Sequence, residues 1–193
     1  MRKMKGKIFV VSGPSGSGKT TLAQAVLAGK QFSGKLEKSV SFTTRPVRRG
    51  EKDQRDYFFI SKKEFLQGLK DQKILEWTKY LGYYYGTARD FIEAQLKKSR
   101  SVILCLDLKG AVKIKELYPR KAVTIFIMPP SLEELARRIE NRHRETSKAE
   151  ITKRLRLAKR EMSSAKEFDF CVVNNDLVQA VKALKGIIAK KIT

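Results

Sequence analysis

The strongest chemical signal in the sequence is a glycine-rich segment near its N-terminal end. Residues 13–20 read GPSGSGKT directly after the apolar residues 8–11 and match the pattern G-x-x-x-x-G-K-[ST]. Glycines let successive N–H groups converge on phosphate oxygens, and a following helix directs its positive end at them. The lysine would reach the β- and γ-phosphates, and the threonine would bind Mg²⁺. The segment predicts a nucleoside triphosphate site formed by Gly13, Pro14, Ser15, Gly16, Ser17, Gly18, Lys19 and Thr20.

Few other side chains suggest covalent or metal chemistry. The chain has one histidine, His143, and two cysteines, Cys105 and Cys171, which lack C-x-x-C spacing. This pattern argues against a zinc site and against a structural disulfide. No nucleophile is recognisably paired with a base, so the sequence favours placement and electrostatics as the means of catalysis.

Composition limits the class of protein and of partner. The 193 residues suit one compact α/β domain, and 42 Lys and Arg against 20 Asp and Glu give a net charge of +22. Such a charge favours anionic partners. The basic residues are spread along the chain without a nucleic-acid-binding motif, so we expect nucleotides as the partners and no specific nucleic acid.

The sequence also bears on location. No signal peptide or membrane span is recognisable, and we expect a cytoplasmic protein with no membrane partner. An oligomer is possible.

The elements that position the glycine-rich segment alternate between apolar runs and amphipathic stretches. This order is typical of a parallel sheet covered by helices on both faces. Core strands are predicted at residues 8–11, 102–106, 122–127 and 168–173. Helices are predicted at residues 19–27, 89–98, 109–117, 132–142, 151–166 and 177–188.

Two regions depart from this alternation. Between residues 34 and 87, short alternating runs (40–43, 57–60 and 75–80) surround a helix near 62–70, which predicts a small antiparallel insertion. Residues 138–160 form two strongly charged helical segments joined by a polar stretch, which predicts a mobile lid. Ser61 with Glu64, and Ser131 with Glu134, have the spacing of helix capping boxes.

Further motifs extend over nearly the whole chain. They read SFTTRPVRRGE (41–51), ILEW (74–77), YYGT (84–87), LDLKGA (106–111), PPSLEEL (129–135) and VVNNDL (172–177). With GPSGSGKT, in this order, they resemble the guanylate kinases. The resemblance implies an α/β P-loop kinase with a central parallel sheet flanked by helices. It also implies Mg²⁺-dependent transfer of a phosphate group from ATP to GMP, giving ADP and GDP in purine nucleotide metabolism.

The resemblance also implies a division of the chain. We expect a single domain over residues 1–193, with a core of residues 1–33, 88–130 and 166–193. The GMP-binding insertion would span about 34–87 and the helical lid about 131–165.

The phosphate of GMP is expected among basic and phenolic side chains of the insertion. In the family, the TTRPVR block and the following tyrosine hold this phosphate, and here they are Arg45, Arg48 and Tyr57, with Tyr85 beside them. A guanidinium offers planar, paired donors to a phosphate, so the residue types suit the role.

The guanine base is expected at Glu76, whose family counterpart accepts hydrogen bonds from N1–H and the amino group. A buried acceptor left unpaired by adenine can reject that base strongly. The same resemblance assigns Ser41 and Thr87 to hydrogen bonds around the base. Trp77 is expected to be a core aromatic residue.

The sequence departs from the family at Cys105, where an acidic residue usually precedes the aspartate by two positions. A thiol is a weak donor and a weaker acceptor. Loss of one charge-assisted hydrogen bond should cost about 1.5 to 3 kcal/mol. We therefore expect Cys105 to give weaker guanine selection without loss of catalysis. Asp107 is kept, and it is expected to border the GMP site, to orient the Mg²⁺ hydration shell with Thr20 and to cap the next helix.

The transfer itself needs no general base, because the acceptor would be a phosphate oxygen that is already ionised. It needs in-line placement and positive charge. Catalytic roles are therefore expected for Lys19, Arg45, Arg142 and Arg154, with Arg138 as the next candidate in the lid. Asn174, in VVNNDL, is expected near the adenine of ATP, and Asp176 is expected to cap a helix.

Two alternatives stay open at the level of sequence. Cys105 leaves room for a kinase on the same scaffold that acts on another phosphorylated acceptor, such as a ribose bisphosphate. A guanylate-kinase-like interaction module without turnover is the other. Such modules usually lose the phosphate-binding loop, which here is intact.

Overall fold

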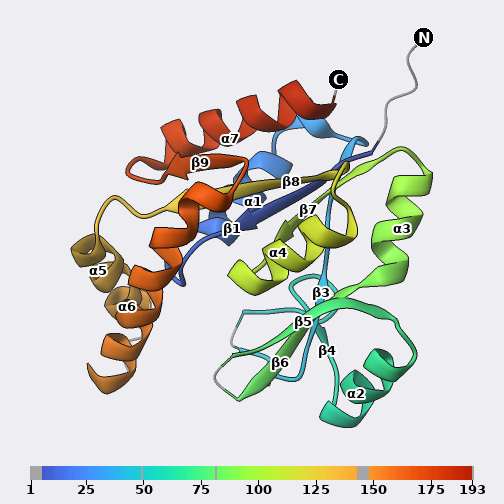
Figure 1. Ribbon diagram of the computed structural model, residues 1–193, viewed down its shortest axis with the longest axis horizontal. Helices are drawn as coiled ribbons and strands as arrows, with labels where there is room; N and C mark the ends of the chain where they lie inside the picture. The colour runs from blue at the N-terminus through green and yellow to red at the C-terminus, as the bar shows by residue number, and fades with distance from the viewer. Residues whose placement is uncertain (1–5, 49, 81, 143–147, 193) are drawn as a thin grey trace.

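A five-stranded parallel sheet forms the centre of the molecule (Figure 1). The computed structural model describes residues 6–48, 50–80, 82–142 and 148–192. The strand order is β2 (Leu36–Lys38), β7 (Ser101–Cys105), β1 (Ile8–Ser12), β8 (Ala122–Met128) and β9 (Phe170–Val173), and each neighbouring pair runs parallel. The sheet confirms the predicted α/β class.

Helices cover both faces of this sheet. Because side chains alternate along a strand, Phe9 and Val11 face α1 (Lys19–Leu27) and α7 (Leu177–Ile192), whereas Ile8 and Val10 face the other way. The second face packs on α3 (Arg89–Lys97) and α4 (Leu108–Leu117). A short 3₁₀ turn, Lys30–Phe32, follows α1 and buries Phe32. The buried core therefore fixes the strand ends that carry the functional residues.

A second, four-stranded sheet lies beside the core with α2 (Lys62–Lys70) at its outer end (Figure 1). Its strand order is β4 (Phe58–Phe59), β3 (Ser41–Thr43), β6 (Tyr83–Ala88) and β5 (Ile74–Tyr80). The β3–β6 and β5–β6 pairs are antiparallel, but β3 and β4 pair in parallel. The prediction of an antiparallel insertion is therefore wrong at this edge, because the long loop between β3 and β4 returns the chain in the same direction.

The lid region consists of α5 (Leu132–Arg142) and α6 (Lys148–Ser163), followed by a 3₁₀ turn, Ser164–Glu167. Both helices project from the same side of the core (Figure 1). They share a small apolar cluster of Leu135, Ile139 and Ala158. His143 and the joint around it lie outside the described residues.

Three strands differ from the sequence-based expectation. Residues 36–38 fall in the range expected for the insertion, but as β2 they pair with β7 in the central sheet. The strand β6 was not predicted, because its three tyrosines and a glycine show no clear apolar alternation. The last strand begins at Phe170 and not at residue 168, since residues 164–167 form the 3₁₀ turn.

The predicted helix-capping residues all accept backbone hydrogen bonds, but only one of the two predicted capping boxes is complete. Ser61 and Glu64 form the predicted reciprocal capping box, and Asp176 accepts a hydrogen bond from the backbone of Gln179. Ser131 accepts one from Glu134 N, but the carboxylate of Glu134 binds Arg137 and Arg138 instead of completing a box.

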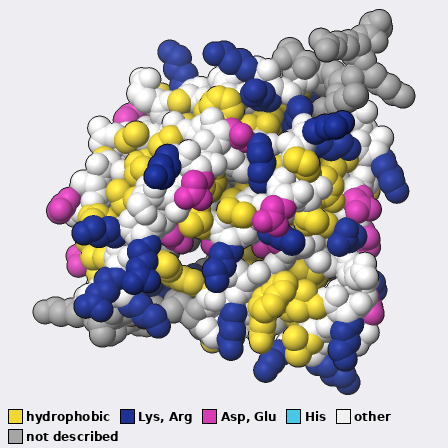
Figure 2. Space-filling view, in the orientation of Figure 1, with side chains coloured by type: hydrophobic (Ala, Val, Ile, Leu, Met, Phe, Trp, Pro, Cys, Tyr) yellow, Lys and Arg dark blue, Asp and Glu magenta, His cyan; other side chains and the backbone are white. Residues whose placement is uncertain are grey.

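Basic side chains are distributed over the surface instead of forming one stripe. Figure 2 shows Lys and Arg side chains over the core helices, the small sheet and the lid helices of the visible face, with the densest group over the lid. Within the described residues, no helix is both long and apolar enough to cross a membrane.

Candidate active site

The phosphate-binding loop joins β1 to α1 at the carboxyl end of the central sheet. Gly13, Gly16 and Gly18 have φ values of 137°, 90° and 95°. Residues other than glycine rarely adopt such positive φ values. Packing also requires glycine at position 13, because a Cβ there would collide with the carbonyl of Ile127. The loop backbone is thus held in a conformation that only glycine permits, directly before the N-terminus of α1.

Lys19 lies across this loop. Its Nζ donates hydrogen bonds to the carbonyls of Gly13 and Pro14 at 2.6 and 2.9 Å. The ammonium group is therefore held against the loop, and Lys19 forms part of the wall of the adjacent cavity. Thr20 follows in the first turn of α1 and is exposed.

A cavity of about 570 Å³ begins at this loop and runs between the small sheet and α6. Four parts of the chain line it: the loop, the small sheet, the β7–α4 junction and the lid helix. The lining includes Gly13, Ser15, Lys19, Ser41, Tyr57, Glu76, Tyr85, Cys105, Asp107, Arg154 and Glu161. The fold thus brings together candidates that are more than 140 residues apart in the sequence.

At the far end of the cavity a bulge in β5 turns Glu76 inward. The β5–β6 register steps from Ile74↔Ala88 to Trp77↔Gly86, so β5 has one extra residue here. As a result Glu76 is 6% exposed and Trp77 is 49% exposed. The prediction that Trp77 is a core aromatic residue is wrong, because the bulge turns Glu76 inward at this point of β5 and leaves Trp77 half exposed.

The carboxylate of Glu76 is held by its neighbours. The hydroxyl of Thr87 donates a 2.6 Å hydrogen bond to Oε1, and Thr87 pairs with Ser41 across the β3–β6 ladder. Burial and the nearby charge of Asp107 raise the pKa of Glu76 to about 7, against the Thr87 hydrogen bond, which lowers it. Sites that arrange such groups in a cleft are candidates for function.

Cys105 ends β7 and contributes to the cavity wall. Burial raises the pKa of its thiol to about 11, so the group stays neutral. The structure therefore places a weak hydrogen-bonding group beside Asp107, where the family resemblance predicts an acid.

Arg45 is buried behind the tyrosines that reach the cavity. It is 6% exposed, and its guanidinium donates to Glu51 Oε1 at 2.8 Å and to the carbonyl of Pro46 at 2.7 Å. It also lies over the Tyr57 ring at 5.5 Å. Tyr57 and Tyr85 form part of the cavity wall, whereas Arg45 and Arg48 do not, and Arg48 is exposed. The expected phosphate contacts are therefore brought to one region, with the arginines at its edge.

Glu51 holds this arrangement and was not among the predicted site residues. Its second carboxylate oxygen accepts from the Arg48 backbone N–H at 2.9 Å. Burial by itself raises the pKa of Glu51, but its bonds to Arg45 and Arg48 outweigh this and lower it. The signal was its position at the end of the SFTTRPVRRGE block, where a carboxylate can fold back on the arginines.

The lid contributes Arg154 to the cavity wall. Arg142 is the last residue of α5, and its side chain lies outside the described residues. Glu161 was not predicted, although it lies two helical turns after Arg154 and on the same face of α6. That spacing was the available signal.

A second hollow lies on the other side of the loop. Gly16, Gly18, Thr21, Arg138, Asn174, Asn175 and Leu177 line it. The side-chain amide of Asn174 donates to the Ser17 carbonyl at 2.8 Å, and Arg138 donates to the Asn174 carbonyl at 3.1 Å. Asn174 therefore fastens the VVNNDL block to the phosphate-binding loop and borders the space expected for adenine.

Oxygen donors suited to Mg²⁺ are present at the loop. Asp107 caps α4, since its Oδ1 accepts from Gly110 N at 2.8 Å, and it also reaches the cavity. Thr20, in the first turn of α1, carries a hydroxyl. Carboxylate and hydroxyl oxygens are hard ligands of the kind that Mg²⁺ prefers, so these residues fit the ion.

The β1–loop–α1 unit and the parallel sheet define a P-loop kinase fold, with a substrate cavity between a small sheet and a helical lid. The sequence profile described as guanylate kinase matches residues 5–191. The chain belongs to the guanylate kinase family.

Similar proteins cover almost all of the chain. A guanylate kinase from Caldanaerobacter subterraneus subsp. tengcongensis is 40% identical over 96% of this chain and 88% of its own length. One from Synechocystis sp. is 43% identical over 97% and 96%. The crystal structure of guanylate kinase from Anaplasma phagocytophilum matches with a TM-score of 0.81 at 33% identity, over 100% of this chain and 89% of that one.

Proposed function

We propose that this protein transfers the γ-phosphate of ATP to GMP, giving ADP and GDP. The observation that carries the proposal is the buried Glu76, which lines one cavity with Lys19 of the phosphate-binding loop. The names of the relatives support the same reaction. A P-loop forms the ATP site in many kinases and does not identify the acceptor, whereas Glu76 accounts for the selection of guanine.

Guanine is selected through the carboxylate of Glu76. N1–H and the exocyclic amino group form a donor pair that a carboxylate can accept, and adenine has no such pair there. Since Glu76 is buried, the wrong base leaves an unpaired charged group, which costs several kcal/mol in typical cases, about 10⁴-fold in selectivity. Thr87 and Ser41 complete the polar edge of this subsite.

The phosphate of GMP lies against Tyr57 and Tyr85, with Arg45 and Arg48 as its counter-charges. Glu51 keeps Arg45 in position before substrate binds. The acceptor oxygen is ionised at neutral pH, so positioning and charge stabilisation are sufficient for attack on the γ-phosphate.

The donor phosphates lie on the loop from Gly13 to Thr20. Lys19 exchanges its carbonyl partners for β- and γ-phosphate oxygens, and Arg142 and Arg154 of the lid stabilise the charge that develops during transfer. Asn174 and Arg138 border the adenine side. Closure of the insertion and the lid over both nucleotides excludes water from the reaction.

Thr20 would hold the Mg²⁺ ion of the ATP complex directly, and Asp107 would hold it through water. The ion supplies positive charge to the β- and γ-phosphate oxygens. A cytoplasmic location is proposed with the reaction, because both nucleotides are metabolites of that compartment.

The test is ADP formation from ATP and Mg²⁺ with different acceptors. GMP, dGMP, IMP, AMP and ribose 1,5-bisphosphate are compared at equal concentration, with Lys19→Ala as the blank. Turnover on GMP well above AMP, lost in Lys19→Ala, supports the proposal. Turnover on ribose 1,5-bisphosphate alone identifies another acceptor, and no turnover on any acceptor supports an interaction module.

A further inference from the structure

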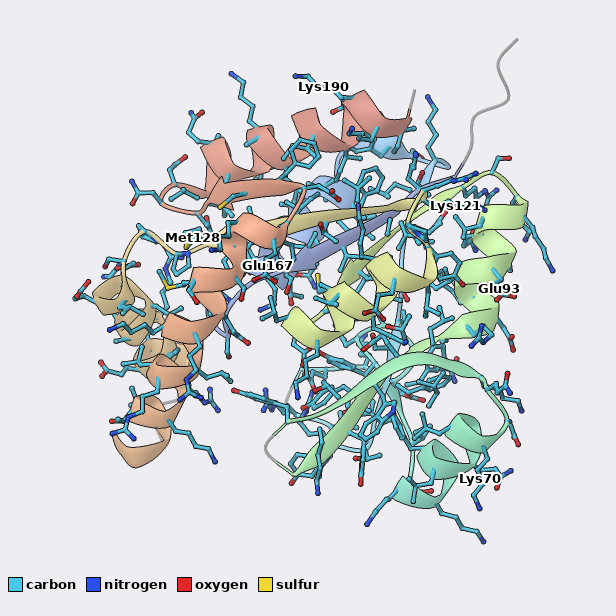
Figure 3. The ribbon with its side chains drawn as sticks, in the orientation of Figure 1. Lys70, Glu93, Lys121, Met128, Glu167 and Lys190 are labelled. Carbon is cyan, nitrogen blue, oxygen red and sulfur yellow. The ribbon has the colours of Figure 1, made fainter. Side chains whose placement is uncertain are left out.

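One face of α6 and of the turn after it enters the cavity. Arg154, Leu157, Glu161 and Ser164 are spaced by three or four residues and all line it. Glu161 is the one carboxylate that the described lid residues contribute to this wall. In Figure 3 the side chains of α6 extend on the side that faces the small sheet.

Glu161 takes no part in the internal structure of the lid. In the described parts of the chain, no hydrogen bond or ion pair engages its carboxylate. Glu134 on α5 shows the contrast, since Arg137 and Arg138 both bind it at 2.8 Å. The half-buried position of Glu161 is therefore explained by neither helix stability nor an ion pair.

Glu161 shares the cavity wall with Arg154 and Arg160 of α6 and with charged groups outside the lid. Its carboxylate interacts electrostatically with the positive charge of Lys19 and with the negative charge of Asp107, which also line the cavity. Burial, with Asp107, raises the pKa of Glu161 to about 7, although Lys19 opposes the shift. A carboxylate near Lys19 repels a nucleotide triphosphate that approaches without a cation.

We propose that Glu161 makes closure of the lid on the triphosphate depend on a divalent cation. The inference rests on ATP as the donor in the proposed function. With Mg²⁺ on the phosphates, carboxylates on two sides of the site, Asp107 from the core and Glu161 from the lid, face positive charge and can accept hydrogen bonds from the water ligands of the ion. Without Mg²⁺, Glu161 faces the phosphates directly and opposes closure. The residue acts on positioning and makes no bond in the transfer.

The test is the affinity for ATP by isothermal titration calorimetry, with Mg²⁺ and with EDTA, in the absence of GMP. Glu161→Gln removes the charge at nearly constant shape. The matched control is Glu167→Gln, which removes one charge from an exposed position outside the cavity wall, at the end of the same segment (Figure 3). Glu161→Asp keeps the charge and is the conservative variant.

At pH 8, where a carboxylate with a pKa of about 7 is mostly ionised, we expect the ratio of the two dissociation constants, metal-free over metal-loaded, to fall about tenfold in Glu161→Gln. Glu167→Gln should keep the wild-type ratio, and Glu161→Asp should keep most of it. Equal ratios in Glu161→Gln and wild type overturn the proposal, and so does an equal loss of affinity for both forms of ATP. Because no acceptor or turnover enters the titration, its result does not depend on whether GMP is the acceptor.

Discussion

Glu76 combines burial, an inward-directed carboxylate and a pKa near neutrality. Its carboxylate accepts from Thr87 and lies near Asp107, which disfavours the charged form. Only the ionised form can accept both hydrogen bonds from guanine. The protonation of one side chain should therefore control acceptor binding at neutral pH.

The first prediction concerns this pH dependence. Because burial raises the pKa of Glu76 to about 7, the carboxylate is mostly protonated at pH 6 and mostly ionised at pH 8. KM for GMP should fall about tenfold between pH 6 and pH 8. Steady-state kinetics at saturating ATP measures it, with Glu76→Gln as the control for ionisation of the GMP phosphate. An equal pH profile in Glu76→Gln would remove Glu76 from the explanation.

Gly110 is required by the position of Glu76. A Cβ on Gly110 would lie 2.7 Å from Glu76 Oε2 and 3.2 Å from its Cδ, so an alanine must displace the carboxylate or the first turn of α4. We predict that Gly110→Ala raises KM for GMP about tenfold or more and changes KM for ATP less than twofold. Gly186→Ala in α7, where no atom lies within 4 Å, is the control for the change in helix propensity. Equal effects on both substrates would contradict the contact.

A substitution at Cys105 offers the complementary experiment, because it can add a hydrogen-bond acceptor to the site. Cys105→Asp places a carboxylate where the thiol now borders the cavity. The lost hydrogen bond amounts to about 1.5 to 3 kcal/mol, so we expect KM for GMP to fall by about tenfold or more and the preference for GMP over AMP to increase. Cys105→Ser serves as the neutral control. An unchanged KM in Cys105→Asp would show that the thiol does not limit guanine binding.

At the scale of elements, local sequence patterns predicted what local interactions determine. The bounds of α1, α2 and α5 follow from the loop glycine, the Ser61 cap and apolar periodicity. The short β2 was missed because three residues acquire strand structure only by pairing with β7. The bulge in β5 was missed for the same reason, and with it the exposure of Trp77. Tertiary pairing overrides propensity in such short segments.

The candidate site shows the same limit. Motif residues could be assigned from the sequence, because each block carries its own chemistry. Glu161 was not assigned, because its spacing from Arg154 was the one available signal and a single acid on a charged helix is usually a solvated side chain. Its place in the cavity depends on how α6 packs, through Leu135, Ile139 and Ala158, on the rest of the lid.

This packing gives a prediction for the lid. The side chains of Leu135 and Ile139 lie against Gly16, so the lid cluster also touches the phosphate-binding loop. Leu135→Ala should cost about 2 to 5 kcal/mol of local packing energy. We expect KM for ATP to rise, and amide hydrogen exchange to accelerate in α5 and α6 with little change in β1 and β8. Equal acceleration in the central sheet would contradict a locally packed lid.

At the scale of the whole molecule, three parts of the fold line one cavity. The central sheet holds the loop and Asp107, the small sheet holds Glu76 and the tyrosines, and α6 supplies Arg154 and Glu161. The chain has a net charge of +22, with Lys and Arg side chains spread over the visible face (Figure 2), which suits two anionic nucleotides. Direct transfer therefore requires both nucleotides to be bound in the same complex.

A rapid-quench single-turnover measurement shows whether the phosphate group passes directly from ATP to GMP. Enzyme in excess is mixed with Mg²⁺, GMP and ATP labelled in the γ-phosphate, and the products are separated by chromatography. We expect the label in the β-phosphate of GDP, at the rate of ADP formation, and no labelled GDP with Lys19→Ala. Label found in a phosphorylated form of the protein that then passes it to GMP, or released as inorganic phosphate in place of labelled GDP, would contradict direct transfer.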